Sequence, residues 1–176
     1  MIILLTGLPG LGKTTILKEF LKLYKDDCFW VLSNELRNEE GLRVGFEAST
    51  SEGETKLIAH KQLIDSDHLI GDYRVDIAAV DDIFTDSVSH AMETPTQLFV
   101  LDEIGRMQML SPNFPSAVDK LFETQTMTLA TIRHGDEWAE KYKQDPKAVV
   151  IEVTEENREG LPSVLLEMIQ TAYRVL

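Results

Sequence analysis

The first twenty residues, MIILLTGLPGLGKTTILKEF (1–20), place a glycine-rich loop between two apolar segments. Ile2 to Leu5 form an apolar run without alternation, which is typical of a strand buried on both faces of a parallel sheet. Apolar residues then recur at helical spacing from about Lys13 to Tyr24, which indicates an amphipathic helix. The stretch therefore predicts a strand, a tight loop and a helix in succession.

The loop itself, GLPGLGKT (7–14), fits the Walker A or P-loop pattern G-x-x-x-x-G-K-[ST]. Glycines let the backbone curl so that successive N–H groups point inward, beside the positive N-terminus of the following helix. We expect Lys13 to reach the β- and γ-phosphates of a nucleotide and Thr14 to bind Mg²⁺. A purely structural turn is the alternative, but the strand–loop–helix context is the one that the motif requires. The residues assigned to nucleotide binding here are Gly7, Leu8, Pro9, Gly10, Leu11, Gly12, Lys13, Thr14 and Thr15.

The second half of the chain alternates between apolar strands and amphipathic helices. Strands are expected at 98–101, 127–132 and 148–153, and helices begin at Ser111-Pro112, near Trp138 and at Pro162. This alternation predicts an α/β fold with a mainly parallel sheet flanked by helices.

Residues 28–60 have a different pattern. Two strand-like runs, 29–36 and 42–48, flank the turn signal RNEEG, and 56–59 add a third. These runs predict an antiparallel hairpin inserted at about 28–60. A helix follows over 77–88, with Asp76 as its N-cap.

Length and composition limit the class of protein. A chain of 176 residues fits a single domain, 1–176. The net charge of −13 repels polyanions, so we expect no nucleic acid partner. Cys28 is the only cysteine, which excludes an internal disulfide. The sequence contains neither a signal peptide nor an apolar run long enough to span a membrane, so we expect a cytoplasmic protein. Nothing in it identifies a protein partner.

The run LFVL (98–101) ends in Asp102-Glu103, at the carboxyl end of a predicted strand. Open α/β sheets bind ligands at this edge, so we expect Asp102 to act as the Walker B acid that holds Mg²⁺. Glu103 is predicted to orient and deprotonate the water that attacks the γ-phosphate, and a structural role is its alternative. The guanine-reading motif N-K-x-D is absent from the sequence.

Two further strand ends are expected to face the same edge. Thr131 closes the run TLAT and is predicted to contact the γ-phosphate or the attacking water; the alternative is an ordinary strand-end threonine. Asn157 and Arg158 follow the last strand, where loops of this architecture meet the nucleotide base. Arg158 could stack on that base or pair with an acid.

These motifs together resemble the small nucleoside-triphosphatase family that includes the human cancer-related nucleoside-triphosphatase and thermophilic relatives. The resemblance covers nearly the whole chain and depends most on DEIGRM (102–107) and on a late Glu-Asn-Arg (156–158). It also rests on the segments GLPGLGKTT, NELRNEEGLRVGF, GDYRVD, ATI and VTEENR. The resemblance implies a RecA-like P-loop NTPase fold and hydrolysis of several nucleoside triphosphates with Mg²⁺.

The chain departs from the family pattern at three places. Residues 30–33 read Trp-Val-Leu-Ser where the family has Gly-Phe-aromatic-Thr, and Met107-Gln108-Met109 replaces Met-Glu-Leu. Arg133 replaces a proline, and it could bind an anion or lie on the surface. Arg37 and Arg43 in the hairpin match the family. One of them could act as an arginine finger or bind a second substrate, but pairing with an acid such as Glu35 is favoured.

The sequence therefore predicts a Mg²⁺-dependent enzyme that hydrolyses the β–γ bond of ATP, GTP and other nucleoside triphosphates. A P-loop kinase and a nucleotide-dependent switch module are the alternatives. An arginine-rich lid, which such kinases commonly close over their substrates, is not evident.

Overall fold

The computed structural model describes residues 1–94 and 98–175. Within them, apolar runs form the strands of one nine-stranded sheet, ordered β5-β6-β4-β3-β2-β7-β8-β1-β9. The strands are β1 (Ile2–Thr6), β2 (Cys28–Arg37), β3 (Arg43–Thr50), β4 (Thr55–His60), β5 (Leu69–Ile70), β6 (Tyr73–Val75), β7 (Leu98–Ile104), β8 (Thr128–Ile132) and β9 (Ala148–Glu152). The helices are α1 (Lys13–Leu23), α2 (Ile77–Val80), η1 (Asp81–Thr85), α3 (Asp86–Glu93), η2 (Gln108–Leu110), α4 (Phe114–Glu123), α5 (Glu137–Lys143) and α6 (Leu161–Val175).

The sheet has a parallel part and an antiparallel part. Strands β9, β1, β8, β7 and β2 run parallel to one another, and β3, β4, β6 and β5 extend the sheet beyond β2 in antiparallel pairs. The predicted α/β class is confirmed, with a mixed sheet. The predicted antiparallel hairpin is present as β2 and β3, and β2 also pairs with β7 along Cys28 to Leu32, so the hairpin is continuous with the parallel sheet.

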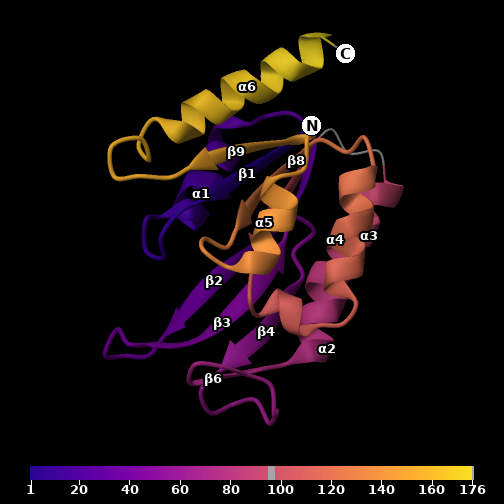
Figure 1. Cartoon of the computed structure of the whole chain (residues 1–176). Coiled ribbons are helices and arrows are strands. Elements are labelled where there is room, and N and C mark those ends of the chain that lie inside the picture. The colour runs from indigo at the N-terminus through magenta and orange to yellow at the C-terminus, as the bar shows by residue number, and fades with distance from the viewer. Residues whose placement is uncertain (95–97, 176) are drawn as a thin grey trace.

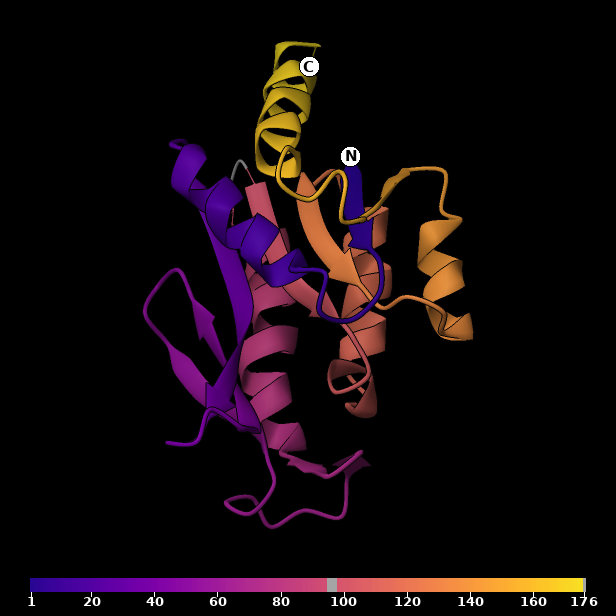
Figure 2. The ribbon, with the colours of Figure 1, turned by 90° about the vertical axis from the view of Figure 1, so that its left-hand side faces the viewer.

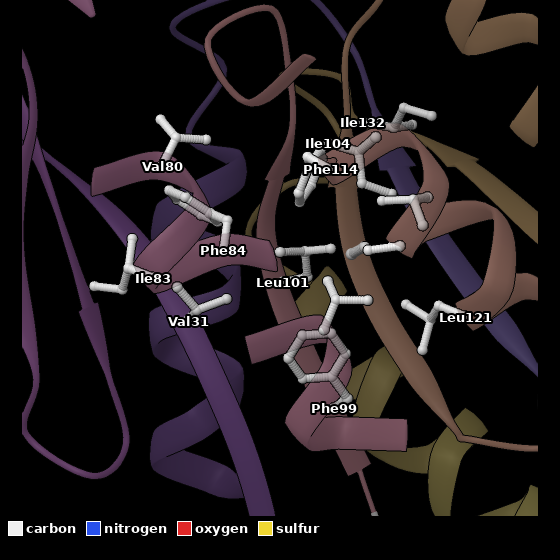
Figure 3. Close-up of a cluster of buried hydrophobic side chains, with 14 of the residues drawn as sticks. Val31, Val80, Ile83, Phe84, Phe99, Leu101, Ile104, Phe114, Leu121 and Ile132 are labelled. Atoms are coloured by element: carbon white, nitrogen blue, oxygen red, sulfur yellow. The ribbon is translucent and has the colours of Figure 1, made fainter. Parts of the chain in front are cut away.

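Helices cover both faces of the sheet (Figures 1 and 2). Successive residues of β1 point to opposite faces: Ile2 and Leu4 join one apolar core, whereas Ile3 and Leu5 join the other. Helices α1 and α6 close the second core, and α2, α3, α4 and α5 close the first. Figure 3 shows the first core, where the labelled side chains of β2, β7 and β8 meet those of the covering helices.

Polar side chains fix where two of the covering helices begin. The predicted N-cap Asp76 accepts a hydrogen bond from the Ala79 N–H at 3.0 Å and starts α2, which continues through the π turn η1 into α3. Helix α4 begins at Phe114 and not at the predicted Ser111-Pro112. The reason is that the Ser111 hydroxyl accepts the Phe114 N–H at 3.2 Å, so Ser111 lies outside the helix.

No helix within residues 1–94 and 98–175 is long and apolar enough to cross a membrane.

Candidate active site

The glycine loop connects β1 to α1, and three of its glycines adopt backbone angles that favour glycine. Gly10 and Gly12 have φ values of 86° and 87°, in the left-handed region. Gly7 has φ 144°, and a Cβ there would lie 2.7 Å from the Val153 carbonyl oxygen, so the loop start needs a residue without a side chain. Gly12 then caps α1, whose N-terminus faces the loop. The loop therefore has the glycine-dependent backbone that the sequence predicted.

The side chain of Lys13 folds back across this loop. Its Nζ donates hydrogen bonds to the carbonyl oxygens of Gly7 at 2.9 Å and Leu8 at 3.2 Å. Burial lowers the pKa of Lys13, and the negative charges of Glu103 and Asp102 oppose that effect. The ammonium group is therefore held where two carboxylates favour its charged form.

Asp102 lies on β7, is 2% exposed and receives hydrogen bonds from three neighbouring elements. Thr14 of α1 donates to its Oδ2 at 2.6 Å, and Thr131 of β8 donates to its Oδ1 at 2.5 Å. The Ser33 hydroxyl of β2 donates to its backbone oxygen at 2.8 Å. Burial raises the pKa of Asp102, while the two threonine hydrogen bonds and the charge of Lys13 lower it.

Glu103 follows Asp102 at the carboxyl end of β7. Burial, followed by the negative charge of Asp102, raises the pKa of Glu103 to about 7, against the opposing charges of Lys13 and Arg133. Its carboxyl group packs over Gly105, where an added Cβ would lie 2.6 Å from the Glu103 Cδ. A carboxyl group with a pKa near neutrality is suited to accept a proton.

A cavity of about 790 Å³ joins these groups. From the loop, six residues line it: Pro9, Gly10, Gly12, Lys13, Thr14 and Thr15. Asp102 and Glu103 line it as well. Gly7, Leu8 and Leu11 do not: Gly7 packs on the 153 backbone, Leu8 is 59% exposed, and Leu11 packs into the core beside α1.

Three further predicted residues also lie outside the cavity lining. Thr131 is fully buried and contacts Asp102, so the structure gives it a positioning contact where the sequence predicted one with phosphate or water. Asn157 organises its own loop, accepting the Thr154 N–H at 2.9 Å and donating to the Glu152 carbonyl at 2.8 Å. Arg158 is exposed beside it. Contact of Asn157 and Arg158 with a base remains a prediction.

The predicted arginine pairing is confirmed in the hairpin. Glu35 binds both Arg37 and Arg43, the latter at 2.7 Å. Arg133 lines the cavity, as Arg37 and Arg43 do. Its closest carboxylate among the described residues is Asp136, 3.6 Å away, and Asp136 also binds Arg106 through two hydrogen bonds.

Gln108 is a cavity residue that the sequence analysis noted only as a departure from the family pattern. It is 2% exposed, and its Oε1 has no hydrogen-bond partner among the described residues. A buried oxygen without a partner is rare in proteins. The only available signal was the polar residue between Met107 and Met109, and its burial could not be read from the sequence.

The fold and this geometry define the class of the protein, a P-loop NTPase. A family described as NTPase matches residues 2–166. The chain is 34% identical to the nucleoside-triphosphatase THEP1 of Thermotoga sp. (strain RQ2), over 97% of this chain and 96% of that one. The chain belongs to the NTPase family, as the resemblance in its motifs predicted.

Solved structures agree with this assignment. The crystal structure of THEP1 from Aquifex aeolicus has a TM-score of 0.82 at 27% identity, covering 96% of this chain and 99% of that one. The solution structure of a human cancer-related nucleoside triphosphatase has a TM-score of 0.76 at 29% identity, covering 97% of each chain. The predicted fold class and enzyme class are therefore confirmed.

Proposed function

We propose that the protein is a Mg²⁺-dependent nucleoside-triphosphatase that hydrolyses the β–γ bond of ATP, GTP and other nucleoside triphosphates. The observation that carries the proposal is the 2.6 Å hydrogen bond from Thr14 to Asp102. It brings the end of the glycine loop and the second acidic strand to one point of the cavity. The family name given to the relatives supports the same substrate class.

In the proposed reaction, the loop amides and Lys13 bind the β- and γ-phosphates and offset their negative charge. Water attacks the γ-phosphorus, the bond to the bridging oxygen breaks, and the nucleoside diphosphate leaves with that oxygen. Glu103 accepts the proton that the attacking water loses, which yields inorganic phosphate. Arg133 also contributes positive charge to the same cavity.

The residues present fit a magnesium ion. Thr14 and Asp102 supply a hydroxyl and a carboxylate oxygen within hydrogen-bond distance of each other. Mg²⁺ prefers oxygen ligands and is commonly held by one or two carboxylates together with substrate phosphates. When bound, it would neutralise charge on the transferring group. Thr131 would keep the Asp102 carboxylate in position and would not contact the phosphate.

Two further proposals concern contact with the nucleotide base and the extent and location of the catalytic domain. Asn157 and Arg158 are proposed to contact the nucleotide base, supported by the close approach of the 153 backbone to Gly7. Residues 1–176 are proposed to act as one catalytic domain, because the loop follows β1 and both acids lie on β7 of the same sheet. We also propose that the protein acts in the cytoplasm.

The test is a phosphate-release assay without any acceptor. ATP, GTP, CTP and UTP would be supplied with Mg²⁺ or with EDTA to the wild type, to Lys13→Ala and to Lys22→Ala. Lys22 is an exposed lysine of α1 that pairs with Glu19, and it serves as the matched control. We expect Mg²⁺-dependent catalytic release in the wild type and in Lys22→Ala. Lys13→Ala should lose at least about tenfold in nucleotide affinity, because charge-assisted hydrogen bonds are lost.

Two results would contradict the proposal. If Lys13→Ala released phosphate as the wild type does, hydrolysis would take place away from the glycine loop. Failure of the wild type to release phosphate from any triphosphate unless a second substrate is added would favour a kinase.

A further inference from the structure

The cavity has a second end, and the proposed hydrolysis assigns no role to the residues there. Beyond Asp102 and Glu103 it continues over the antiparallel strands, where it is lined by Glu35, Arg37, Arg43, Phe46, Ile70 and Tyr73. We refer to these six residues as the aromatic end. They come from β2, β3, β5 and β6, the part of the sheet that extends the parallel strands.

Aromatic rings and a guanidinium group are packed together there. The rings of Phe46 and Tyr73 meet edge to face, with centroids 5.1 Å apart and an interplanar angle of 70°. The Arg43 guanidinium lies 5.2 Å from the Phe46 centroid and 5.6 Å from that of Tyr73. The Arg43 Nε also donates to the Tyr73 hydroxyl at 3.0 Å. These contacts hold the rings in a fixed arrangement, as recognition of a planar ligand requires.

Positive charge exceeds negative charge at this end. Two guanidinium groups, those of Arg37 and Arg43, share the single carboxylate of Glu35. The Nζ of Lys61 lies 5.2 Å from the Tyr73 ring centroid, but it also lies 3.6 Å from the Asp72 carboxylate, so the excess comes from the two arginines. In a protein with a net charge of −13, such a local excess favours an anionic ligand.

The sheet order shows which part of a bound nucleotide this end would face. The glycine loop follows β1, Asp102 is on β7, and β2 and β3 lie beyond β7. Lys13 is assigned to the terminal phosphates, and Asp102 is assigned to the Mg²⁺ that would lie beside them. The aromatic end is therefore on the γ-phosphate side of the site. The base side of the triphosphate is assigned to the loop after β9, at the opposite edge of the sheet.

We propose that the aromatic end binds a second small molecule, a planar aromatic ring that carries an anionic group, of which a nucleoside monophosphate is an example. The cavity volume of about 790 Å³ is near the upper limit of small-molecule sites, roughly 300–1,000 Å³. The inference rests on the proposed function only for the direction of the triphosphate. It requires no hydrolysis.

Calorimetric titration of AMP tests the proposal, using protein saturated with Mg²⁺ and a non-hydrolysable ATP analogue. We expect one AMP per loaded chain. Arg43→Gln and Tyr73→Leu should each weaken AMP binding by about tenfold or more, since each removes a charged or stacking contact. Lys22→Ala is again the matched control and should bind AMP as the wild type does. Adenosine lacks the anionic phosphate group, and ribose 5-phosphate lacks the aromatic base. Each should bind at least about tenfold more weakly than AMP.

The side chain of Arg43 is 44% exposed, so we expect Arg43→Gln to fold. It therefore tests the proposal even if Tyr73→Leu does not fold. AMP that binds only to analogue-free protein would be competing at the glycine loop and would overturn the proposal. Binding to the loaded protein that Arg43→Gln leaves unchanged would also overturn it. A protein that releases phosphate but does not bind AMP refutes this inference alone. One that binds AMP as expected but never releases phosphate refutes the proposed hydrolysis alone.

Discussion

Replacing Glu103 by glutamine should stabilise the metal-free protein at high pH. The folded structure raises the pKa of Glu103 from an ordinary 4.5 to about 7, chiefly by burial. A raised pKa means that the folded protein holds the proton more tightly than the unfolded chain does. The stability that protonated Glu103 contributes is therefore fully present below pH 4.5 and is lost as the pH rises through 7.

The size of the effect follows from the same values. A rise from 4.5 to about 7, at about 1.36 kcal/mol per pKa unit, corresponds to about 3 kcal/mol. Glutamine keeps the shape of the side chain and never ionises. The free energy of unfolding of the wild type should therefore fall relative to that of Glu103→Gln as the pH rises from 4 to 9. The difference should change by about 3 kcal/mol in favour of the variant.

Urea unfolding in EDTA, at several pH values, measures this difference directly. The matched control is Glu123→Gln, which removes an exposed carboxylate at the end of α4. The free energy of unfolding of Glu123→Gln should differ from that of the wild type by a nearly constant amount from pH 4 to pH 9. A flat difference for Glu103→Gln as well would show that Glu103 ionises freely, and would refute the argument from burial.

The same variant tests catalysis. With Mg²⁺ and saturating ATP, turnover should fall by about 10²-fold or more, because a positioned base contributes about that much. Binding of a non-hydrolysable analogue should change little. If turnover and binding fall together, Glu103 is a structural or metal-binding residue and not the base.

Three further variants test single contacts. Thr131→Val leaves Asp102 Oδ1 without its hydrogen bond, and should lower the free energy of unfolding by about 1–3 kcal/mol in urea titrations, whereas Thr131→Ser should not. Gly105→Ala adds a Cβ against the Glu103 carboxyl group, and should lower the turnover number several-fold with little change in analogue affinity. Gln108→Met removes a buried oxygen that has no partner among the described residues, so we expect unchanged or higher stability but weaker analogue binding; a clear loss of stability would contradict this.

The parallel part of the fold could be predicted because its signals are local. Each buried strand is a short apolar run, and the glycine loop requires a strand before it and a helix after it. The same locality predicted the Asp76 cap and the two acids near the carboxyl end of β7. These features depend on residues a few positions apart, which a sequence displays directly.

The pairing of β2 could not be predicted in this way. Its antiparallel partner β3 is close in sequence and joined by a turn, whereas its parallel partner β7 begins at Leu98, far along the chain. The hairpin signal was therefore visible and the parallel contact was not. Strands β5 and β6 contain two and three residues, too few to show a period.

The role of Thr131 was missed for a related reason. Its position at a strand end predicted the correct edge of the sheet but could not show which way its hydroxyl points. In the structure that hydroxyl donates to Asp102 and is fully buried. Asn157 lies in the loop after β9, where its amide forms hydrogen bonds with the backbone of residues 152 and 154, and its contact with a base stays a prediction.

These contacts explain how an acidic protein can hold a polyphosphate. Burial of Asp102 raises its pKa, so its negative charge is costly unless other groups compensate for it. Two threonine hydroxyls orient the carboxylate, but hydroxyl dipoles cannot neutralise it. A divalent cation can, and the same cation attracts the phosphates that Asp102 and Glu103 would otherwise repel. Because the cavity itself also carries positive groups, Lys13 and Arg133 among them, affinity for a triphosphate should depend on Mg²⁺ more than on the net charge of the protein surface.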